Sequence, residues 1–488
     1  MSKIIIQAPR QGIASSPFVG FGNVQNLDID STSGVAKLNN ILVKKSGSTV
    51  TAQVNWIVQD PVNTANFYAL DSSANVYNST DSGATWASLS TRSNAGQGLA
   101  IWKDYLFVAE TTTIDVYGPL SGAPAWTNNF KTIDSDTLWH PMLISKNDGK
   151  LYGGAGRFVF SLEEVGTFNP ANAATYTWTQ QALDLPSPYK IKCIEELGNN
   201  LMLGTWQGTN VYDIRVGDIF PWDRSSVSFG QPVIFAEYGV HAMLNVGNSL
   251  VVLAGINGTI FRCDGANAYI IGQLPINLSG GKYLEFYPGA ICNYKNKVFF
   301  GVGNGGTTAN AGQGIYSLLQ TGRGNILNLE HQNSQLTDGS AASVKISALL
   351  PVSRDQILAA FRSNTTYGID LTTNTSYAYS TDYSGSFDSQ IIDVGVNENK
   401  WKPAQAQLRL GRPLRTGEGI QLSYRASLAD SFTVVKTLAY ADNGVGAIIT
   451  KTFPIQIPDN VKQTDQVQFR IGLLGNTTSP EFKTLIIE

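Results

Sequence analysis

The chain has 488 residues, which is more than one compact domain usually holds, so we expect at least two structural units. Only 15% of the residues are charged, the net charge is -3, and Gly occurs 48 times. This composition is typical of short strands joined by many turns, and it excludes a strongly basic surface for nucleic-acid phosphates and a fold built on long surface helices. No stretch reaches the ~18 apolar residues of a membrane span, so we expect none.

Residues 1–45 precede any repeating pattern. The run Ile4-Ile5-Ile6 is too short for the apolar core of a signal peptide, so we expect the chain to fold in the cytoplasm of the cell that makes it. Residues 26–30 and 34–38 predict a turn followed by a strand. Two roles stay open for this segment: a strand that closes the domain that follows, or an extended arm that reaches a neighbouring subunit.

One pattern recurs over residues 46–384. A strand with alternating apolar residues leads through a tight polar turn to a strongly apolar strand, and a short strand with Tyr or Phe follows, as in 101–108 and 114–117. One apolar position per copy recurs at a mean spacing of about 48 residues, the length of a four-stranded propeller blade. The spacing predicts a β-propeller of about seven blades, with six or eight left open. These positions are Phe67, Leu106, Leu151, Leu201, Leu250, Val298 and Ile357.

The repeat stops near residue 384, and residues 385–488 show alternating strands of another kind. Seven or eight strands in about 100 residues are typical of a β-sandwich, here of jelly-roll type. The last of them, 484–487, should be paired inside a sheet. The predicted fold class is therefore all-β: an about seven-bladed β-propeller followed by a C-terminal jelly-roll-like β-sandwich, with residues 1–45 as an N-terminal arm or closing strand.

The sharpest local motif is an Asp-box at residues 79–86, with the pattern S-x-D-x-G-x-T-W. The Asp81 carboxylate should accept N–H groups of the turn, Gly83 should adopt a backbone conformation closed to residues with a Cβ, and Trp86 should pack beneath. The motif resembles the hairpin turn of sialidase-type propellers, where it lies away from the active site, so the predicted role is structural. The motif residues are Ser79, Asp81, Gly83, Thr85 and Trp86.

Residues suited to catalysis or metal binding are few and scattered. The histidines show no metal-ligand spacing and stand beside no nucleophile motif, and the cysteines lie in apolar runs that predict buried free thiols. We therefore expect no catalytic residue, cofactor or metal site, and no enzyme; paired carboxylates stay open because their spacing is three-dimensional. The adjacent Glu195 and Glu196 predict a solvated hairpin edge. The histidines and cysteines are His140, His241, His331, Cys193, Cys263 and Cys292.

Three features together resemble the tail nozzle or hub proteins of short-tailed bacteriophages. The first is the N-terminal segment with 17–21 (Pro-Phe-Val-Gly-Phe), 26–30 and 34–38, and the second is the long, weakly repetitive propeller. The third is the terminal sandwich, with the runs 421–425 (Gln-Leu-Ser-Tyr-Arg), 430–433 (Asp-Ser-Phe-Thr) and 469–471 (Phe-Arg-Ile). The resemblance concerns architecture and short phrases, and it spans most of the chain.

The resemblance implies a structural virion protein of a phage tail. In that family a closed ring of copies, commonly six, forms the distal tail tube through which the genome leaves. The ring joins the upper tail or adaptor protein to tail fibres or receptor-binding parts. Double-stranded DNA in transit should not be bound specifically, and a mildly acidic, low-charge wall is compatible with this because each phosphate contact would retard sliding. A ring also requires head-to-tail interfaces that close.

Two other functions stay open. The first is a receptor- or glycan-binding protein at the tail tip or in a fibre, which a groove at a propeller mouth or on the sandwich would favour. The second is an enzyme such as a sialidase or a polysaccharide depolymerase. A sialidase needs an arginine cluster and a Tyr nucleophile paired with Glu, and Arg157, Arg262, Arg362 and the pair Glu237-Tyr238 form no such pattern.

Overall fold

The computed structural model of the chain is built from β-strands, and the part of the chain that it describes contains no α-helix. The described residues include two short 3-10 helices, η1 (Ala173–Thr175) and η3 (Tyr440–Asn443). The chain divides into a smaller unit, Met1–Leu42, Gly314–Gln335 and Thr372–Glu488, and a larger unit, Val43–Gln313 and Leu336–Leu371. The structure describes residues 4–9, 23–29, 34–135, 139–207, 217–274, 276, 283–305, 313–321, 324–332, 344–363, 365–373, 377, 384–393, 405–443, 449–455, 466–475 and 477–487.

The larger unit contains four-stranded antiparallel sheets in which consecutive strands are neighbours. Tight polar turns join the strands. The two-residue turn Lys103-Asp104 has φ of 50° and 67°, and Lys295-Asn296 has φ of 53° and 59°. Positive φ at both central residues matches the right-handed twist of the strands that flank a hairpin. The turns that the sequence places between the strands of each copy therefore determine the up-and-down order of the sheets.

Five of these sheets are contiguous in sequence. The first holds β6 (Val54–Gln59), β7 (Phe67–Asp71), β8 (Asn75–Ser79) and β9 (Ala87–Thr91), and the second holds β10 (Gly96–Trp102), β11 (Tyr105–Glu110), β12 (Thr113–Gly118) and β13 (Ala125–Thr132). The third holds β14 (Met142–Ile144), β15 (Leu151–Ala155), β16 (Phe158–Glu164) and β17 (Tyr176–Asp184). The fourth holds β18 (Tyr189–Leu197), β19 (Asn200–Gln207), β20 (Asp218–Trp222) and β21 (Val233–Ile234), and the fifth holds β22 (Val240–Val246), β23 (Ser249–Ala254), β24 (Thr259–Cys263) and β25 (Ala268–Gln273).

The last sheet of the larger unit takes a strand from the N-terminal part of the chain. Its order is β31-β32-β33-β5, with β31 (Val344–Pro351), β32 (Ile357–Ser363), β33 (Thr366–Thr372) and β5 (Leu42–Lys44). Two roles were open for the N-terminal segment, and β5 takes the first of them: it is a strand that closes the larger unit. Between the fifth and the last sheet lie β26 (Leu284–Glu285), β27 (Ile291–Tyr294) and β28 (Lys297–Asn304), with β28 paired to both others.

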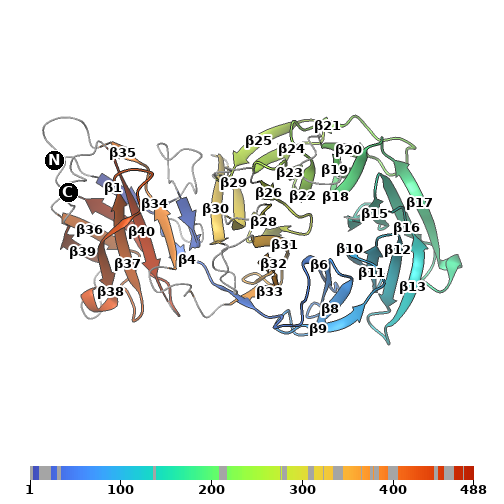
Figure 1. Cartoon of the computed structure of the whole chain (residues 1–488), viewed down its shortest axis with the longest axis horizontal. Helices are drawn as coiled ribbons and strands as arrows, with labels where there is room; N and C mark the ends of the chain where they lie inside the picture. Colours follow the sequence, from blue (N-terminus) through green and yellow to red (C-terminus); the bar gives the residue numbers. More distant parts are fainter. Residues whose placement is uncertain are drawn as a thin grey trace. The chain divides into compact units, whose positions relative to one another are not determined.

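The first strands of successive sheets form a closed cycle. β6 contacts β10, β10 contacts β14, and the contacts continue through β18, β22, β27 and β31 back to β6. Figure 1 shows the sheets of the larger unit radiating from a common centre, in chain order from blue to orange. Antiparallel four-stranded sheets that radiate around an axis and close on themselves define a β-propeller.

The apolar cores of the larger unit lie between neighbouring sheets. Phe107 of the second sheet packs with Phe160 of the third, and Tyr77 of the first sheet packs with Leu358 of the last. One four-stranded sheet has two apolar faces and cannot bury both by itself. Because every sheet of the cycle is covered on each side by a neighbour, the closed ring buries both faces and leaves only short edges.

The smaller unit contains two main sheets. One has the order β1-β41-β36-β39, with β1 (Ile4–Gln7), β41 (Phe482–Ile487), β36 (Gln405–Leu410) and β39 (Thr450–Pro454). The other has the order β29-β30-β2-β34-β40-β37-β38, with β29 (Gly314–Thr321), β30 (Gly324–Gln332), β2 (Asn23–Gln25), β34 (Gly385–Asp388), β40 (Gln466–Leu474), β37 (Gly419–Arg425) and β38 (Thr433–Ala439). β35 (Ile392–Asp393) pairs with β40, and β3 (Leu27–Asp28) pairs with β4 (Lys37–Leu38).

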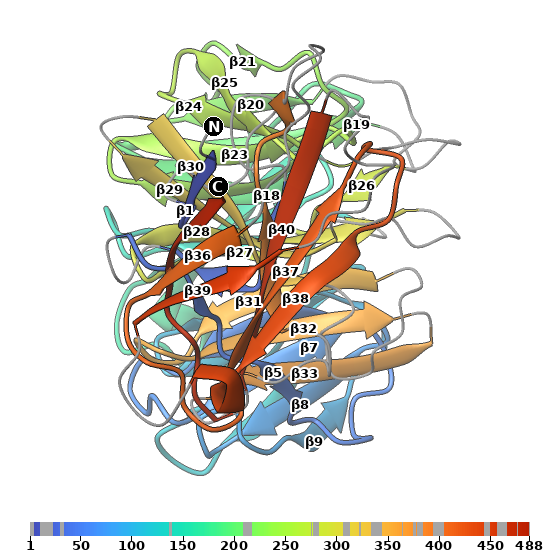
Figure 2. The same cartoon turned by 90° about the vertical axis from the view of Figure 1, so that its left-hand side faces the viewer.

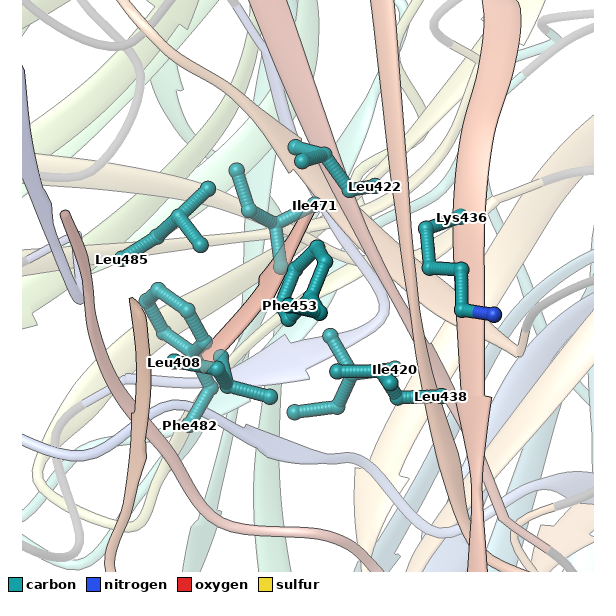
Figure 3. Close-up of a pocket in the computed structure, with 9 residues that line it drawn as sticks. All are labelled: Leu408, Ile420, Leu422, Lys436, Leu438, Phe453, Ile471, Phe482 and Leu485. Carbon is teal, nitrogen blue, oxygen red and sulfur yellow. The ribbon is translucent and has the colours of Figure 1, made fainter. Parts of the chain in front are cut away.

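The two sheets of the smaller unit share one apolar interior. Leu408, Phe453 and Leu485 from the first sheet face Ile420 and Ile471 from the second around a cavity of about 10 Å³. Figure 3 shows these side chains converging, with the ammonium group of Lys436 directed away from them. A cavity of this size is at most the space of one water molecule, and its apolar walls offer a water no hydrogen-bond partner. The interior is therefore tightly packed.

The two units do not follow the boundaries expected from the sequence, 1–45, 46–384 and 385–488. β1 pairs with β41 and β2 with β34, so these two strands of the N-terminal segment belong to the sheets of the smaller unit. The hairpin β29–β30 also groups with the smaller unit, and the larger unit ends at Leu371. An alternating pattern indicates which face of a strand is buried, but it does not indicate which distant strand is its neighbour.

The docking of β1 can be tested with two adjacent isoleucines. Ile6 is 4% exposed and Ile5 is 54% exposed. We expect Ile6→Ala to lower the free energy of unfolding of the smaller unit by about 2–4 kcal/mol because it leaves a cavity. The control Ile5→Ala should cost less than about 1 kcal/mol. Hydrogen exchange of β41, the strand paired with β1, measures both effects by mass spectrometry, and equal effects of the two variants would contradict the docking.

Candidate functional site

The Asp-box residues lie together at the hairpin between β8 and β9. The hydroxyl group of Ser79 donates to Oδ1 of Asp81 (2.8 Å) and accepts the N–H of Gly83 (2.9 Å). Asp81 also accepts the N–H of Thr85 at Oδ1 (2.8 Å) and the Thr85 hydroxyl at Oδ2 (2.6 Å). Burial raises the pKa of Asp81, but the hydrogen bonds donated by Thr85 and Ser79 outweigh it and leave the pKa lowered. The turn is fixed by its own side chains.

Gly83 and Trp86 connect this turn to the last sheet of the ring. Gly83 has a φ of 81°, and a Cβ at this position would lie 2.8 Å from Cδ2 of Leu358 on β32. Trp86 is 6% exposed and packs in the apolar cluster that contains Leu358 and Tyr77. The motif thus fastens the first sheet to the last, at the point where the ring closes, and these contacts give it a structural role.

A second group of side chains, the axial cluster, lies at the centre of the ring. The ring centroid of Trp139, just before β14, lies 6.5 Å from that of Trp56 on β6 and 5.8 Å from that of Tyr287, just before β27. β6, β14 and β27 are not neighbours in the cycle, so these rings meet across the axis. Trp139 therefore blocks the axis at this level. The axial cluster consists of Trp56, Trp139, Lys192, His241, Glu285, Tyr287 and Lys345.

Lys192 on β18 is the buried cation of the axial cluster, with 5% of its surface exposed. Its Nζ lies 2.8 Å from Nδ1 of His241 on β22 and donates to the carbonyl oxygen of Phe286 at 3.3 Å. The same Nζ lies 5.4 Å and 5.8 Å from the ring centroids of Trp139 and Trp206. Aromatic faces attract a cation electrostatically, so they replace part of the hydration that burial removes.

Burial also determines the protonation of this pair. It lowers the pKa of Lys192 to about 8, against smaller opposing contributions from Cys193 and Glu285. Burial and the neighbouring Lys192 hold the pKa of His241 well below its usual range, so the imidazole is neutral. Because Lys192 donates to Nδ1 of His241, we assign the imidazole proton to Nε2. The cluster therefore holds a cation that is stabilised by π faces and by an imidazole lone pair.

Glu285 links the axial cluster to β31. Its Oε2 accepts the hydroxyl of Tyr287 at 2.6 Å and lies 2.6 Å from Nζ of Lys345. Burial, together with Glu285, raises the pKa of Tyr287 well above its usual range, so the phenol stays protonated and keeps donating. A reaction centre needs room for a substrate. Packed rings and closed hydrogen bonds instead suit a structural plug in the axis.

Other residues considered from the sequence also have structural surroundings. His140 is fully buried, and its Nδ1 and Nε2 lie 3.0 Å and 3.3 Å from the carbonyl oxygens of Gly154 and Thr111. All three cysteines are buried free thiols, which confirms the sequence prediction. Among the described residues, no group of three or more His, Cys, Asp or Glu could hold a metal ion. In that same part of the chain, no helix is long and apolar enough to cross a membrane.

The prediction of a solvated edge at Glu195 and Glu196 is wrong for Glu196, which is 7% exposed. Its Oε1 lies 3.0 Å from Nη1 of Arg224, and its Oε2 accepts the N–H of Lys146 at 2.9 Å. The Nε of Arg224 lies 3.7 Å from Oδ2 of Asp148. This network joins the third sheet to the fourth. The sequence does not predict this network, because the residues around Glu196 would look the same whether its carboxylate were exposed or paired with the distant Arg224.

The three C-terminal phrases meet in one place on the smaller unit. Phe432, just before β38, lies between two guanidinium groups, whose Cζ atoms are 4.6 Å (Arg425, β37) and 3.9 Å (Arg470, β40) from its ring centroid. Arg470 also forms a bidentate ion pair with Asp388 on β34, at 2.6 and 2.9 Å. Figure 2 shows β37, β38 and β40 side by side, as their pairing requires. The N-terminal phrase 17–21 lies outside the described residues.

Comparison with known proteins shows no family for this chain. No protein-family profile and no curated protein matches it. Solved structures are similar at a low level. U3-55K matches with a TM-score of 0.45 and 12% sequence identity over 68% of this chain and 97% of its own, and YCF48 bound to a D1 peptide matches with a TM-score of 0.44 and 12% identity over 74% and 100%. The computationally designed Ika8 protein matches with a TM-score of 0.38 and 14% identity over 75% of this chain and 99% of its own. Scores this low do not establish a shared fold, so the β-propeller rests on the strand pairing itself.

The buried cation gives a pH-dependent prediction. The folded pKa of Lys192 is about 8 and its ordinary value is 10.5. Between these values the unfolded chain binds the proton and the folded chain does not, so the contribution of Lys192 to stability rises with pH. Lys192→Met lacks this contribution. We expect its stability relative to the native protein to fall by about 3 kcal/mol between pH 7 and pH 10.5.

Denaturant unfolding at several pH values measures this difference. Loss of the hydrogen bond to His241 lowers the stability of the variant by the same amount at every pH between 7 and 10.5. The test is therefore how the difference in stability between variant and native protein changes with pH. The control Lys190→Met removes a partly exposed lysine of the same strand and measures the effect of losing a lysine as such. A change with pH for Lys192→Met that is no larger than the change for this control would contradict a buried cation.

Proposed function

We propose that this chain is a structural virion protein of a bacteriophage tail. A closed ring of copies, six in the family that it resembles, forms the distal tail tube or nozzle, through which the genome leaves. The protein joins the upper tail or adaptor protein to tail fibres or receptor-binding parts, and it has no enzymatic role. After folding in the host cytoplasm it is assembled into the virion.

The finer fold in this proposal is a seven-bladed propeller with a jelly-roll-like sandwich. Seven first strands, from β6 to β31, follow one another around the cycle and support seven blades. Two sheets with a common apolar interior support a sandwich for the smaller unit. Both β1 and β2 belong to that unit, so the sandwich includes N-terminal strands as well as the C-terminal residues.

One observation carries the proposal: the three C-terminal phrases that resemble nozzle proteins are neighbours in space. In the same sheet, β2, which lies between the N-terminal phrases 17–21 and 26–30, pairs with β34, β34 pairs with β40, and β40 pairs with β37. Phe432 of the phrase 430–433 stacks against arginines of the phrases 421–425 and 469–471. Chance resemblances in short phrases would be scattered over the molecule. Phrases that contact one another are what a shared structural module would retain.

The blocked axis restricts how such a protein could form a conduit. Trp139 meets Trp56 and Tyr287 across the propeller axis, so duplex DNA cannot pass along it. In the proposed tail tube, the genome therefore runs between copies of the chain. A ring built from identical chains requires a head-to-tail interface that closes after a fixed number of copies. The net charge of -3 suits a wall along which phosphates slide without being held.

The ring can be tested directly with the purified full chain. We expect native mass spectrometry and negative-stain images to show a closed ring, or a monomer that tail extract recruits into one, because copies of this chain form the wall of the proposed tube. Added double-stranded DNA should leave the mass unchanged. A strict monomer or trimer that binds host cells without joining the tail would contradict the nozzle and support a receptor-binding fibre instead.

The position of the conduit can be tested with Trp139→Ala. This change removes the ring that blocks the propeller axis. If the genome passes between copies, we expect phage that carry the variant to eject DNA at the native rate, measured by dye binding to the released genome. The control Trp126→Ala removes a half-buried ring that stacks on Tyr117 in the second sheet. Faster ejection for Trp139→Ala alone would place the conduit on the axis.

A further inference from the structure

A groove of about 680 Å³ lies on the surface of the larger unit. One wall is the connection between β20 and β21, from Pro221 to Gln231, and the other is the turn between β24 and β25, from Gly265 to Asn267. Asn200, the first residue of β19, also lines it. The volume is in the range of sites that bind small molecules and short oligomers. Neither the axial cluster nor the Asp-box contributes to this groove.

The first wall is held in shape by its own hydrogen bonds. Oδ1 of Asp223 accepts the N–H groups of Ser225 (2.9 Å) and Ser226 (2.7 Å), and Oδ2 accepts the Ser226 hydroxyl at 2.6 Å. The indole N–H of Trp222 donates to the carbonyl oxygen of Ser226 at 2.8 Å. A loop fixed in this way loses little conformational entropy when a ligand binds, and such preorganisation favours affinity.

The second wall is held in the same manner. Oδ1 of Asp264 accepts the N–H groups of Ala266 (2.9 Å) and Asn267 (2.7 Å). Gly265 has a φ of 98°, and a Cβ there would lie 3.2 Å from Cδ2 of Leu197. This turn is therefore restricted both by its hydrogen bonds and by the side chain beneath it. Two rigid walls face one open space.

The groove presents neutral polar groups and one aromatic ring. The side chains of Asn200, Ser228 and Gln231 line it, and among the described residues they have no hydrogen-bond partner. Phe229 also lines it, and its ring is held at 4.8 Å from that of Phe220 in an edge-to-face contact. Phe229 is half-buried, and planar amides and hydroxyls beside such a ring are the groups that bind the hydroxyls and the apolar face of a sugar.

The charge of the groove restricts the ligand further. The described residues that line it include no Lys, Arg or His, and Asp223 is the one carboxylate among them. Arg224, within the same loop, is directed instead to Glu196 (3.0 Å) and is 11% exposed. A site without a cation gives no charge-assisted hydrogen bond to a phosphate, a sulfate or a sugar acid. The ligand chemistry that remains is polar and uncharged.

We propose that this groove binds a neutral oligosaccharide. Asn200, Ser228 and Gln231 donate to and accept from the sugar hydroxyls, and Phe229 contacts the apolar face of one sugar ring. Hydrolysis of a glycoside by the common mechanisms needs two carboxyl groups beside the scissile bond; among the described residues that line the groove there is one, Asp223, and Asp264 is engaged by the N–H groups of its own turn. The site therefore binds without cleaving. This inference does not depend on the proposed tail function, because the groove lies within one chain.

A glycan array tests the proposal with the purified full chain. The array carries neutral hexasaccharides, namely maltohexaose, cellohexaose, chitohexaose and mannohexaose, and acidic counterparts, namely a heparin hexasaccharide and a sialic acid hexamer. We expect at least one neutral hexasaccharide to bind, no acidic one to bind, and no reducing sugar to be released. Titration calorimetry then gives the dissociation constant of the best neutral probe.

Three variants locate the binding in the groove. Phe229→Ala should weaken binding of that probe ~10-fold by removing the ring contact, and Gln231→Ala should weaken it ~3- to 10-fold by removing a hydrogen bond. Ala266→Trp should abolish binding by filling the groove without deleting a contact. Ala266 and Gln231 are exposed, so folding should survive both changes. The control Val227→Ala changes a residue of the same loop that does not line the groove and should bind as the native chain does.

Several results would overturn the proposal. Failure of every neutral hexasaccharide to bind would do so, as would binding of an acidic probe in preference to the neutral ones. Binding that Gln231→Ala and Ala266→Trp leave at the native level would place any sugar site elsewhere. These outcomes are separate from the mass of the assembled ring, so the sugar site and the tail nozzle can fail independently.

Discussion

The burial of both faces of every four-stranded sheet is the constraint on which the larger unit depends. A single meander leaves both apolar faces in water, and only a neighbour on each side buries both of them. The ring must therefore close, and it does so with β5 beside β33, two strands that are far apart in the sequence. The Asp-box adds a second fastening at the same junction, because Gly83 and Trp86 pack against β32 and its cluster.

The axial cluster at the centre of the ring shows how buried charged side chains are stabilised. Lys192 is buried, and among the described residues an imidazole, a carbonyl oxygen and two indole faces replace water around its ammonium group. Glu285 is occupied by Lys345 and Tyr287, so its charge is balanced nearby. Groups that satisfy one another in this way support a rigid scaffold. A rigid scaffold suits the proposed role, in which the protein presents surfaces to its neighbours in a tail.

The sequence predicts those features that each segment determines alone. Apolar positions about 48 residues apart, the tight turns and the Asp-box all report local structure, and they lead to the propeller. Features that depend on contacts between distant segments cannot be predicted from the sequence. Ile4–Gln7 gives no sign that it pairs with Phe482–Ile487, and Lys192 reads as one polar residue in an apolar strand. The groove between two loops was equally hidden, because Asn, Ser and Gln in a turn are ordinary turn residues.

The pairing of β1 with β41 has a consequence for synthesis of the protein. Ile4 pairs with Ile487, so β1 leaves the ribosome long before its partner strand β41 and has to wait for it. At roughly 5–20 residues per second the delay is on the order of a minute. The propeller needs nothing beyond β33 to close, so it can form before β41 is made, whereas the smaller unit acquires β1 as an edge strand only after β41 has left the ribosome.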